Sequence, residues 1–147
     1  MPSRRRARQE ALQILFSWDL RRQPLDEAIA AYYDSLTMEE LSGSGGAGAA
    51  QQPARDPFVE LLVRGAVEHL AEIDQKITQH AEHWRIERMP TVDRNILRLA
   101  IFEMTQTETP APVAIDEALE LAHRFSEEKS VQFINGVLDA VHRERGG

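Results

Sequence analysis

The sequence contains no cysteine and no long apolar run, and these absences exclude several classes of protein. Without cysteine, the 147-residue chain has no disulfide framework, no thiolate-bound metal or cluster and no thiol nucleophile. The longest uninterrupted apolar run, at 28–33, is six residues, whereas a membrane-spanning helix needs about 18 or more. Polar residues also interrupt the apolar segment near the start, which therefore does not resemble a secretory signal. These features predict a cytoplasmic protein.

Length and composition predict one globular domain over 1–147. Hydrophobic residues make up 42% and charged residues 28%, as in ordinary globular proteins, and the chain is long enough to bury a core unaided. The segment 42–55 is rich in glycine, serine and alanine, a composition typical of flexible linkers. The 41 residues before it are too few to fold alone. We therefore expect a flexible insertion between two helices of one domain.

The charge of the chain is unevenly distributed. The formal net charge is −7, which argues against a general affinity for nucleic acids. Residues 1–22, however, contain six arginines and two acidic residues, for a net charge of +4, so the remainder carries −11. A basic end on an acidic body is expected of a protein that presents one face to a polyanion.

The hydrophobic pattern predicts an all-α fold, a compact helical bundle of about seven helices. Apolar residues recur at helical spacing along the chain, while the alternation typical of strands never persists. The segment 57–84 forms one long helix or two helices with a bend near residue 71. The expected helix signals are a Ser3 cap with a helix to about Leu20, Pro24 opening a second helix, Asp56-Pro57 opening a third, a core helix over 91–106, a turn at 109–112, and Ser130 capping the last helix.

Three residues within this pattern carry further expectations. Trp84 and Phe125 continue the apolar faces of their predicted helices, which favours the core over the surface for both. Gly136 lies inside the last predicted helix, where glycine costs roughly 1 kcal/mol relative to alanine. We therefore expect a second helix to pack closely against Gly136, because the energy gained from this contact would offset the cost.

No catalytic arrangement emerges from the sequence. The glycines of the 42–55 segment lack the lysine and the strand–helix context of a phosphate-binding loop. His80 and His83 have a spacing that could hold a metal, but such pairs are common on solvated helix faces and no closed ligand set accompanies them. We therefore expect a protein that is not an enzyme and has no metal or cofactor.

The strongest local signal is the basic cluster Arg4, Arg5, Arg6 and Arg8 at the start of the first predicted helix. The helix N-terminus adds free backbone amides and a positive dipole, so the cluster favours phosphate. Crowded like charges destabilise a helix end unless an anion binds there. A basic start that is disordered and only solubilising is the alternative. Proteins that bind single-stranded RNA also need flat side chains on which bases stack. Phe16, on the same predicted helix as the basic cluster, is such a side chain.

Four stretches resemble the signature motifs of the NusB family of bacterial transcription antitermination factors, in order over nearly the whole chain. The segment 42–55 is the main departure from that family. The motifs are Arg4-Arg5-Arg6-Ala7-Arg8, Asp93-Arg94 followed by Ile96-Leu97-Arg98-Leu99-Ala100 and Glu103, Val113-Ala114-Ile115-Asp116-Glu117-Ala118 with Glu120-Leu121-Ala122, and Phe133-Ile134-Asn135-Gly136-Val137-Leu138-Asp139.

The resemblance implies a non-catalytic RNA-binding protein. Members of the family bind the boxA element of ribosomal RNA leaders together with the small-subunit ribosomal protein NusE. With NusA, NusG and RNA polymerase they allow transcription to pass terminators. The ribosomal partner is basic, so an acidic body is electrostatically complementary to it.

The resemblance also implies roles for individual residues. The RNA-binding residues would be Arg4, Arg5, Arg6, Arg8, Phe16, Lys129, Ser130 and Phe133. Phe16 stands where relatives often carry tyrosine, so the ring is kept and the hydroxyl is lost. Lys129 stands where relatives carry an acid, which should strengthen the attraction for phosphate. Glu87 and Asp93 fall where the family contacts its ribosomal partner.

Two other functions remain open at this stage. NusB-like domains also occur in certain ribosomal RNA cytosine methyltransferases, and this chain, which has no cofactor-binding αβ unit, could act as a partner subunit. Family members also exist as homodimers, and a dimer could cover the RNA-binding face.

Overall fold

The computed structural model describes residues 3–43 and 55–146, which form seven α-helices and one 3₁₀ helix. No strand occurs within these two ranges, which confirms the predicted all-α class with about seven helices. Most of the predicted insertion 42–55 lies outside the described residues. The helices are α1 (Arg4–Arg21), α2 (Leu25–Gly43), α3 (Pro57–Glu68), α4 (Leu70–His80), η1 (Ile86–Arg88), α5 (Thr91–Gln106), α6 (Ala111–Phe125) and α7 (Glu128–Glu144).

Local sequence signals explain where several helices begin. The Ser3 hydroxyl accepts a hydrogen bond from the backbone N–H of Arg6 at 3.0 Å and caps α1. The Asp56 carboxylate accepts one from the N–H of Phe58 at 2.9 Å, and Pro57 occupies the first helical position of α3. The segment 57–84 contains two helices, because the chain leaves α3 at His69 before α4 begins.

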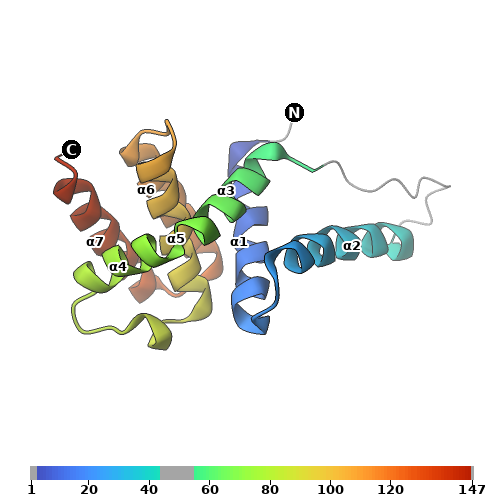
Figure 1. The fold of residues 1–147 in the computed structure, drawn as a ribbon, viewed down its shortest axis with the longest axis horizontal. Helices are drawn as coiled ribbons and strands as arrows, with labels where there is room; N and C mark the ends of the chain where they lie inside the picture. The colour runs from blue at the N-terminus through green and yellow to red at the C-terminus, as the bar shows by residue number, and fades with distance from the viewer. Residues whose placement is uncertain (1–2, 44–54, 147) are drawn as a thin grey trace.

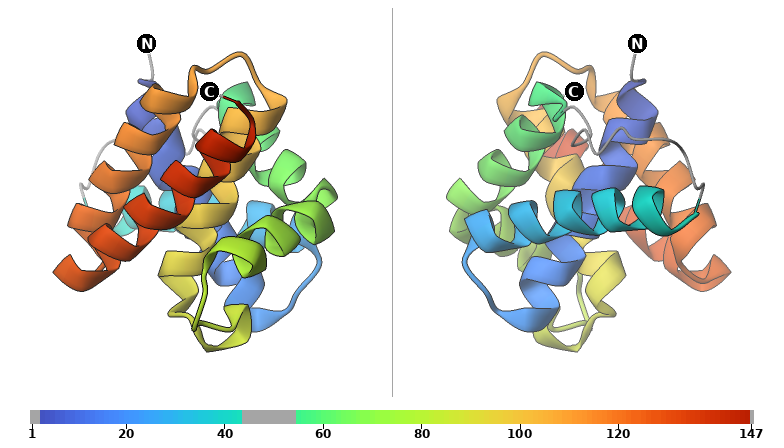
Figure 2. Two further views of the ribbon diagram at one scale, coloured as in Figure 1. Left: turned by 90° about the vertical axis from the view of Figure 1, so that its left-hand side faces the viewer. Right: turned by 90° about the vertical axis from the view of Figure 1, so that its right-hand side faces the viewer.

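Helix α5 forms the centre of the molecule and packs against α1, α3, α4, α6 and α7. Its middle is almost fully buried, including Ile96, Leu97 and Ile101. Helices α6 and α7 lie side by side on one flank of α5, whereas α2 packs chiefly on α1 and extends away from the other helices (Figures 1 and 2). None of the described helices combines the length and apolarity needed to cross a bilayer.

The two helical glycines differ in what surrounds them. A Cβ atom built on Gly65 in α3 would lie 2.1 Å from the Phe102 ring of α5, so the absence of a side chain allows these helices to approach. Gly136 is exposed, and a Cβ there would meet no atom within 4 Å. The expectation that another helix packs closely against Gly136 is therefore wrong.

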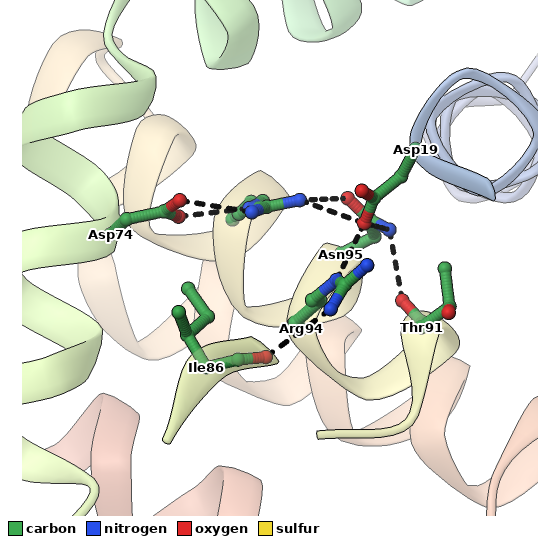
Figure 3. A network of polar contacts seen from close by, with 7 residues as sticks. Asp19, Asp74, Ile86, Thr91, Arg94 and Asn95 are labelled. Carbon is green, nitrogen blue, oxygen red and sulfur yellow. Dashed lines mark hydrogen bonds and ion pairs between the residues drawn. The ribbon is translucent and has the colours of Figure 1, made fainter. Parts of the chain in front are cut away.

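A network of charged side chains fastens α1 and α4 to α5 (Figure 3). The Asp19 carboxylate accepts hydrogen bonds from Arg94 at 2.6 Å, Asn95 at 3.0 Å and Arg98 at 2.9 Å. Arg98 also donates two bonds to Asp74, at 2.8 and 2.9 Å. Burial alone would raise the pKa of Asp19, but the bonds from Arg94 and Asn95 and the charge of Arg98 lower it overall.

Candidate nucleic-acid interface

The arginines at the start of α1 have different surroundings. Arg5 has a side chain that is 59% exposed, and its guanidinium donates two hydrogen bonds to Glu117 of α6, at 3.1 and 2.9 Å. These bonds lower the pKa of Glu117, with the charges of Arg5 and Arg8 adding to the effect and partial burial opposing it. Arg5 is therefore accessible to solvent, but it is held in place by a carboxylate.

Arg8 points inward, and its guanidinium is committed to internal partners. Its Nε atom donates to Glu103 of α5 at 2.9 Å, its Nη2 atom bonds the other oxygen of Glu103, and its Nη1 atom lies 3.5 Å from Glu117. Both Arg8 and Glu103 are buried. The predicted phosphate contact by Arg8 therefore competes with this buried ion pair, which the crowded basic sequence did not reveal.

Arg4 and Arg6 are both exposed. The Arg4 guanidinium lies over the Phe58 ring of α3, 4.1 Å from its centroid, in a cation–π contact. Among the described residues, neither Arg4 nor Arg6 has an ion-pair partner. These two cations are therefore available to an external anion.

Phe16 lies on α1 with part of its ring in solvent, at 38% exposure. It follows Arg5, Gln9 and Gln13 at helical spacings of three and four residues, so these four residues share one edge of α1. Phe16 is therefore on the same edge of the helix as the exposed Arg5.

The turn between α6 and α7 positions the remaining predicted RNA-binding residues. Lys129 is exposed, whereas the Ser130 hydroxyl is buried and donates to Asp93 at 2.6 Å. The Ser126 hydroxyl donates to the other oxygen of Asp93, so this buried carboxylate holds both sides of the turn to the start of α5. Ser130 lies inside the first turn of α7, which begins at Glu128, so the prediction that it caps the helix is wrong.

Phe133 contacts Trp84 edge to face, with ring centroids 6.3 Å apart and planes at 61°. The prediction that Trp84 and Phe125 belong to the core is wrong, because they are 55% and 41% exposed. Helix α4 ends at His80, and the chain then turns, so Trp84 leaves the helical pattern that its spacing implied.

Two adjoining hollows connect these residues. The first lies between α1 and α6 and is lined by Arg5, Arg8, Gln9, Glu117 and Arg124 among others. The second, of about 950 Å³, lies between η1, the start of α5 and the α6–α7 turn. Arg124 lines both hollows, whereas Phe133 lines only the second. Of the predicted RNA-binding residues, Arg5 and Arg8 therefore line the first hollow and Lys129, Ser130 and Phe133 line the second, whereas Arg4, Arg6 and Phe16 line neither of the two.

Glu87 is exposed on a different side of η1 from the second hollow. It lines a third hollow together with Trp18, Asp19 and Arg94, above the Asp19 network. Asp93, which the resemblance also assigns to the contact with the ribosomal partner, is buried under the α6–α7 turn.

The sequence did not indicate that Arg124 and Trp84 lie at the surface near the predicted site. It also did not indicate that Glu117 pairs with the basic cluster. Glu117 lies more than a hundred residues from Arg5 in the chain, so no local spacing connects the two. Within the described residues, no group of three or more histidine, aspartate or glutamate side chains is arranged to hold a metal ion. His80 pairs with Glu144 instead.

The fold is that of a small all-helical protein, and the two hollows carry exposed cations and flat side chains, groups that can hold phosphates and stack on bases. The comparison with protein families confirms the resemblance seen in the motifs. The NusB family model matches residues 5–143, and the chain belongs to that family.

Relatives and solved structures agree with this assignment. The chain is 67% identical to the transcription antitermination protein NusB of Solibacter usitatus, over 98% of this chain and 91% of the relative. The solved NusB of T. maritima is 32% identical with a TM-score of 0.76, covering 97% and 92% of the two chains. A solved complex of the antitermination factors NusB and NusE with double-stranded RNA gives a TM-score of 0.74 at 28% identity, covering 96% of each chain.

Proposed function

We propose that this chain is a non-catalytic, RNA-binding transcription antitermination factor that binds single-stranded boxA RNA together with NusE. The observation that carries the proposal is the group of exposed arginines Arg4, Arg5 and Arg6 at the capped N-terminus of α1, on an otherwise acidic protein. A helix N-terminus and exposed guanidinium groups both favour phosphate. The name of the solved complex of NusB and NusE with double-stranded RNA supports RNA as the class of ligand and NusE as the partner, whereas boxA and a single strand are part of this proposal.

In this proposal the residues of the cluster act differently. Arg4, Arg5 and Arg6 bind phosphates, and Phe16 stacks on a base further along α1. Arg8 is a positioning residue, because its buried pair with Glu103 fixes the start of α1 on α5 and its Nη1 atom approaches Glu117. When RNA binds, a phosphate replaces Glu117 as the partner of Arg5.

The α6–α7 turn supplies the second part of the RNA surface. Lys129 attracts the phosphate backbone, and Phe133 offers a ring to a base. Ser130 acts indirectly, since its bond to Asp93 holds the turn in place. Lys129 and Phe133 therefore contact the RNA, and Ser130 is a positioning residue.

NusE binds on the side of the molecule that carries Glu87, beside the Asp19 network. Glu87 is exposed there, and a carboxylate suits a basic ribosomal protein. With NusE and RNA bound, the assembly joins NusA, NusG and RNA polymerase during transcription of ribosomal RNA.

The test is a titration of boxA-containing single-stranded RNA with and without NusE over a series of salt concentrations. Log affinity should fall linearly with log salt, and the Arg5→Ala/Arg6→Ala variant should reduce the slope by about 1.4, or about 0.7 per lost phosphate contact. In the titration without NusE, Arg21→Ala/Arg22→Ala is the matched control, since it removes two exposed arginines from the other end of α1. Equal slopes for both variants, or no RNA binding even with NusE present, would contradict the proposal.

A further inference from the structure

Two aromatic side chains that line the second hollow, Trp84 and Phe125, are exposed to solvent. Trp84 and Phe125 leave large parts of their rings in solvent, although both could gain stability by burial. Trp84 is held by its backbone N–H, which donates to the carbonyl of Ala81 at 2.7 Å, and by its edge-to-face contact with Phe133. The first contact fixes the backbone at Trp84 and the second orients its indole, while the residue stays 55% exposed.

Cations surround this aromatic surface. Arg88, Arg124 and Lys129 line the hollow, and all three are exposed. Among the described residues Arg88 and Arg124 have no ion-pair partner, and Lys129 has only the exposed Glu127 at 3.6 Å. The other acidic lining residue, Asp93, accepts hydrogen bonds from two serines. The hollow therefore combines exposed rings with three cations against the two carboxylates of Asp93 and Glu127, and Arg88 and Arg124 have no ion-pair partner among the described residues.

The position of the hollow connects it to the proposed RNA path. Arg124 lines both this hollow and the one that contains Arg5 and Glu117. The first hollow also contains the carboxylates Glu117 and Glu120, but a strand whose phosphates contact Arg5 can pass from there to Arg124 and enter the second hollow.

We propose that the second hollow is a nucleobase-binding site, in which one unpaired base of the RNA stacks on Trp84 while Arg88 and Arg124 hold the flanking phosphates. The proposal rests on the proposed function and adds to it a base-stacking residue and two phosphate-binding residues. A protein segment is the competing occupant, but Arg88 and Arg124, which have no ion-pair partner among the described residues, and the continuity with the hollow that contains Arg5 favour a polyanion. Every base has a π-face, so stacking here tolerates different bases.

The first experiment uses tryptophan emission with the full chain and the boxA-containing RNA. Trp84 and Trp18 are the only tryptophans, so in the Trp84→Phe variant Trp18 alone emits. RNA should quench the emission of the wild type and leave that of Trp84→Phe nearly unchanged. Quenching of equal size in both proteins would contradict stacking on Trp84.

The second experiment measures affinity. Trp84→Leu should bind RNA about five-fold or more weakly than the wild type, with an unchanged salt slope, because stacking contributes on the order of 1–3 kcal/mol per base and releases no counterions. Leu61→Ala, which shortens an exposed apolar side chain on α3, should bind as the wild type does. Arg88→Ala should lower the slope by about 0.7, whereas Arg85→Ala, an exposed neighbour that does not line the hollow, should not.

The RNA itself provides the decisive control. In an otherwise identical oligonucleotide, an abasic nucleotide at the position that contacts Trp84 should remove the difference between the wild type and Trp84→Leu. Scanning abasic nucleotides along the strand identifies that position, and no such position would overturn the inference.

The outcomes separate this inference from the proposed function. If Arg5→Ala/Arg6→Ala weakens RNA binding but Trp84→Leu does not, the RNA-binding function stands and the nucleobase site is refuted. If Trp84→Leu weakens binding of NusE and leaves RNA affinity unchanged, the hollow is a protein-docking surface and the inference is overturned. Circular dichroism of each variant verifies that the fold is intact.

Discussion

Replacing Arg8 with alanine should destabilise the fold far more than it disturbs any surface contact. The substitution leaves the Glu103 carboxylate, 2% exposed, without the guanidinium that donates both of its charged hydrogen bonds. Breaking a buried ion pair by removing one partner costs about 3–5 kcal/mol. At roughly 2–4 °C per kcal/mol for a chain near this length, Tm should fall by about 6–20 °C.

Thermal unfolding followed by circular dichroism measures this effect, and two comparisons assign it to the ion pair. Arg5→Ala removes an exposed arginine three residues earlier and should leave Tm nearly unchanged. The double variant Arg8→Met/Glu103→Leu removes both charges, so it should recover much of the stability lost in Arg8→Ala.

The melting temperature, the RNA affinity and the salt slope of Arg8→Ala together distinguish a structural role of Arg8 from a direct phosphate contact. If Arg8→Ala melts at the wild-type temperature, binds RNA more weakly and shows a shallower salt slope, then Arg8 binds phosphate directly and the pair with Glu103 is dispensable. A lower Tm with an unchanged salt slope in the folded protein is the expected outcome instead.

Three further predictions concern packing and titration. In urea unfolding, Gly65→Ala should cost about 1–3 kcal/mol because its Cβ would overlap the Phe102 ring, whereas Gly136→Ala should gain about 0.5–1 kcal/mol because its Cβ points into open space. Because folding lowers the pKa of Asp19, this residue stabilises the fold fully above its ordinary pKa near 3.8, and the stabilisation is lost as pH falls through the lower pKa of the folded state. Asp19→Asn should therefore make the free energy of unfolding depend less on pH in the acid range. Burial, with the nearby Glu10, raises the pKa of Tyr32 to about 12, so an alkaline absorbance titration should find this phenol protonated at pH 10.

The helices could be predicted because their signals are local. Ser3 and Asp56 cap helices as expected, and the apolar spacing located α5 at its observed bounds, 91–106. The break at His69 could be predicted only as one of two alternatives, a bend near residue 71 or no bend, since the apolar period continues through it without proline or glycine. Trp84 was misplaced for the same reason, because periodicity does not show that the helix has already ended.

The candidate site was predictable in its residue types and less so in their partners. Arg5 and Arg8 look equivalent in the sequence, but one faces solvent and the other is buried against Glu103. Their carboxylate partners lie on α5 and α6, about a hundred residues away, so only the tertiary packing distinguishes the two arginines. The same holds for Asp93, whose serine partners come from the α6–α7 turn.

The pairing of charges explains how an acidic protein can present a surface for a polyanion. Arg8, Arg94 and Arg98 are each held by carboxylates at the contacts of α1 and α4 with α5, so they contribute stability and little surface potential. Arg6 and Arg124, among the described residues, have no such partner and lie at the start of α1 and the end of α6. At physiological salt, charges more than about 8 Å apart are largely screened, so a bound strand responds to these nearby cations rather than to the net charge of −7. The salt slope of binding should therefore follow the number of cations at the start of α1 and along the two hollows.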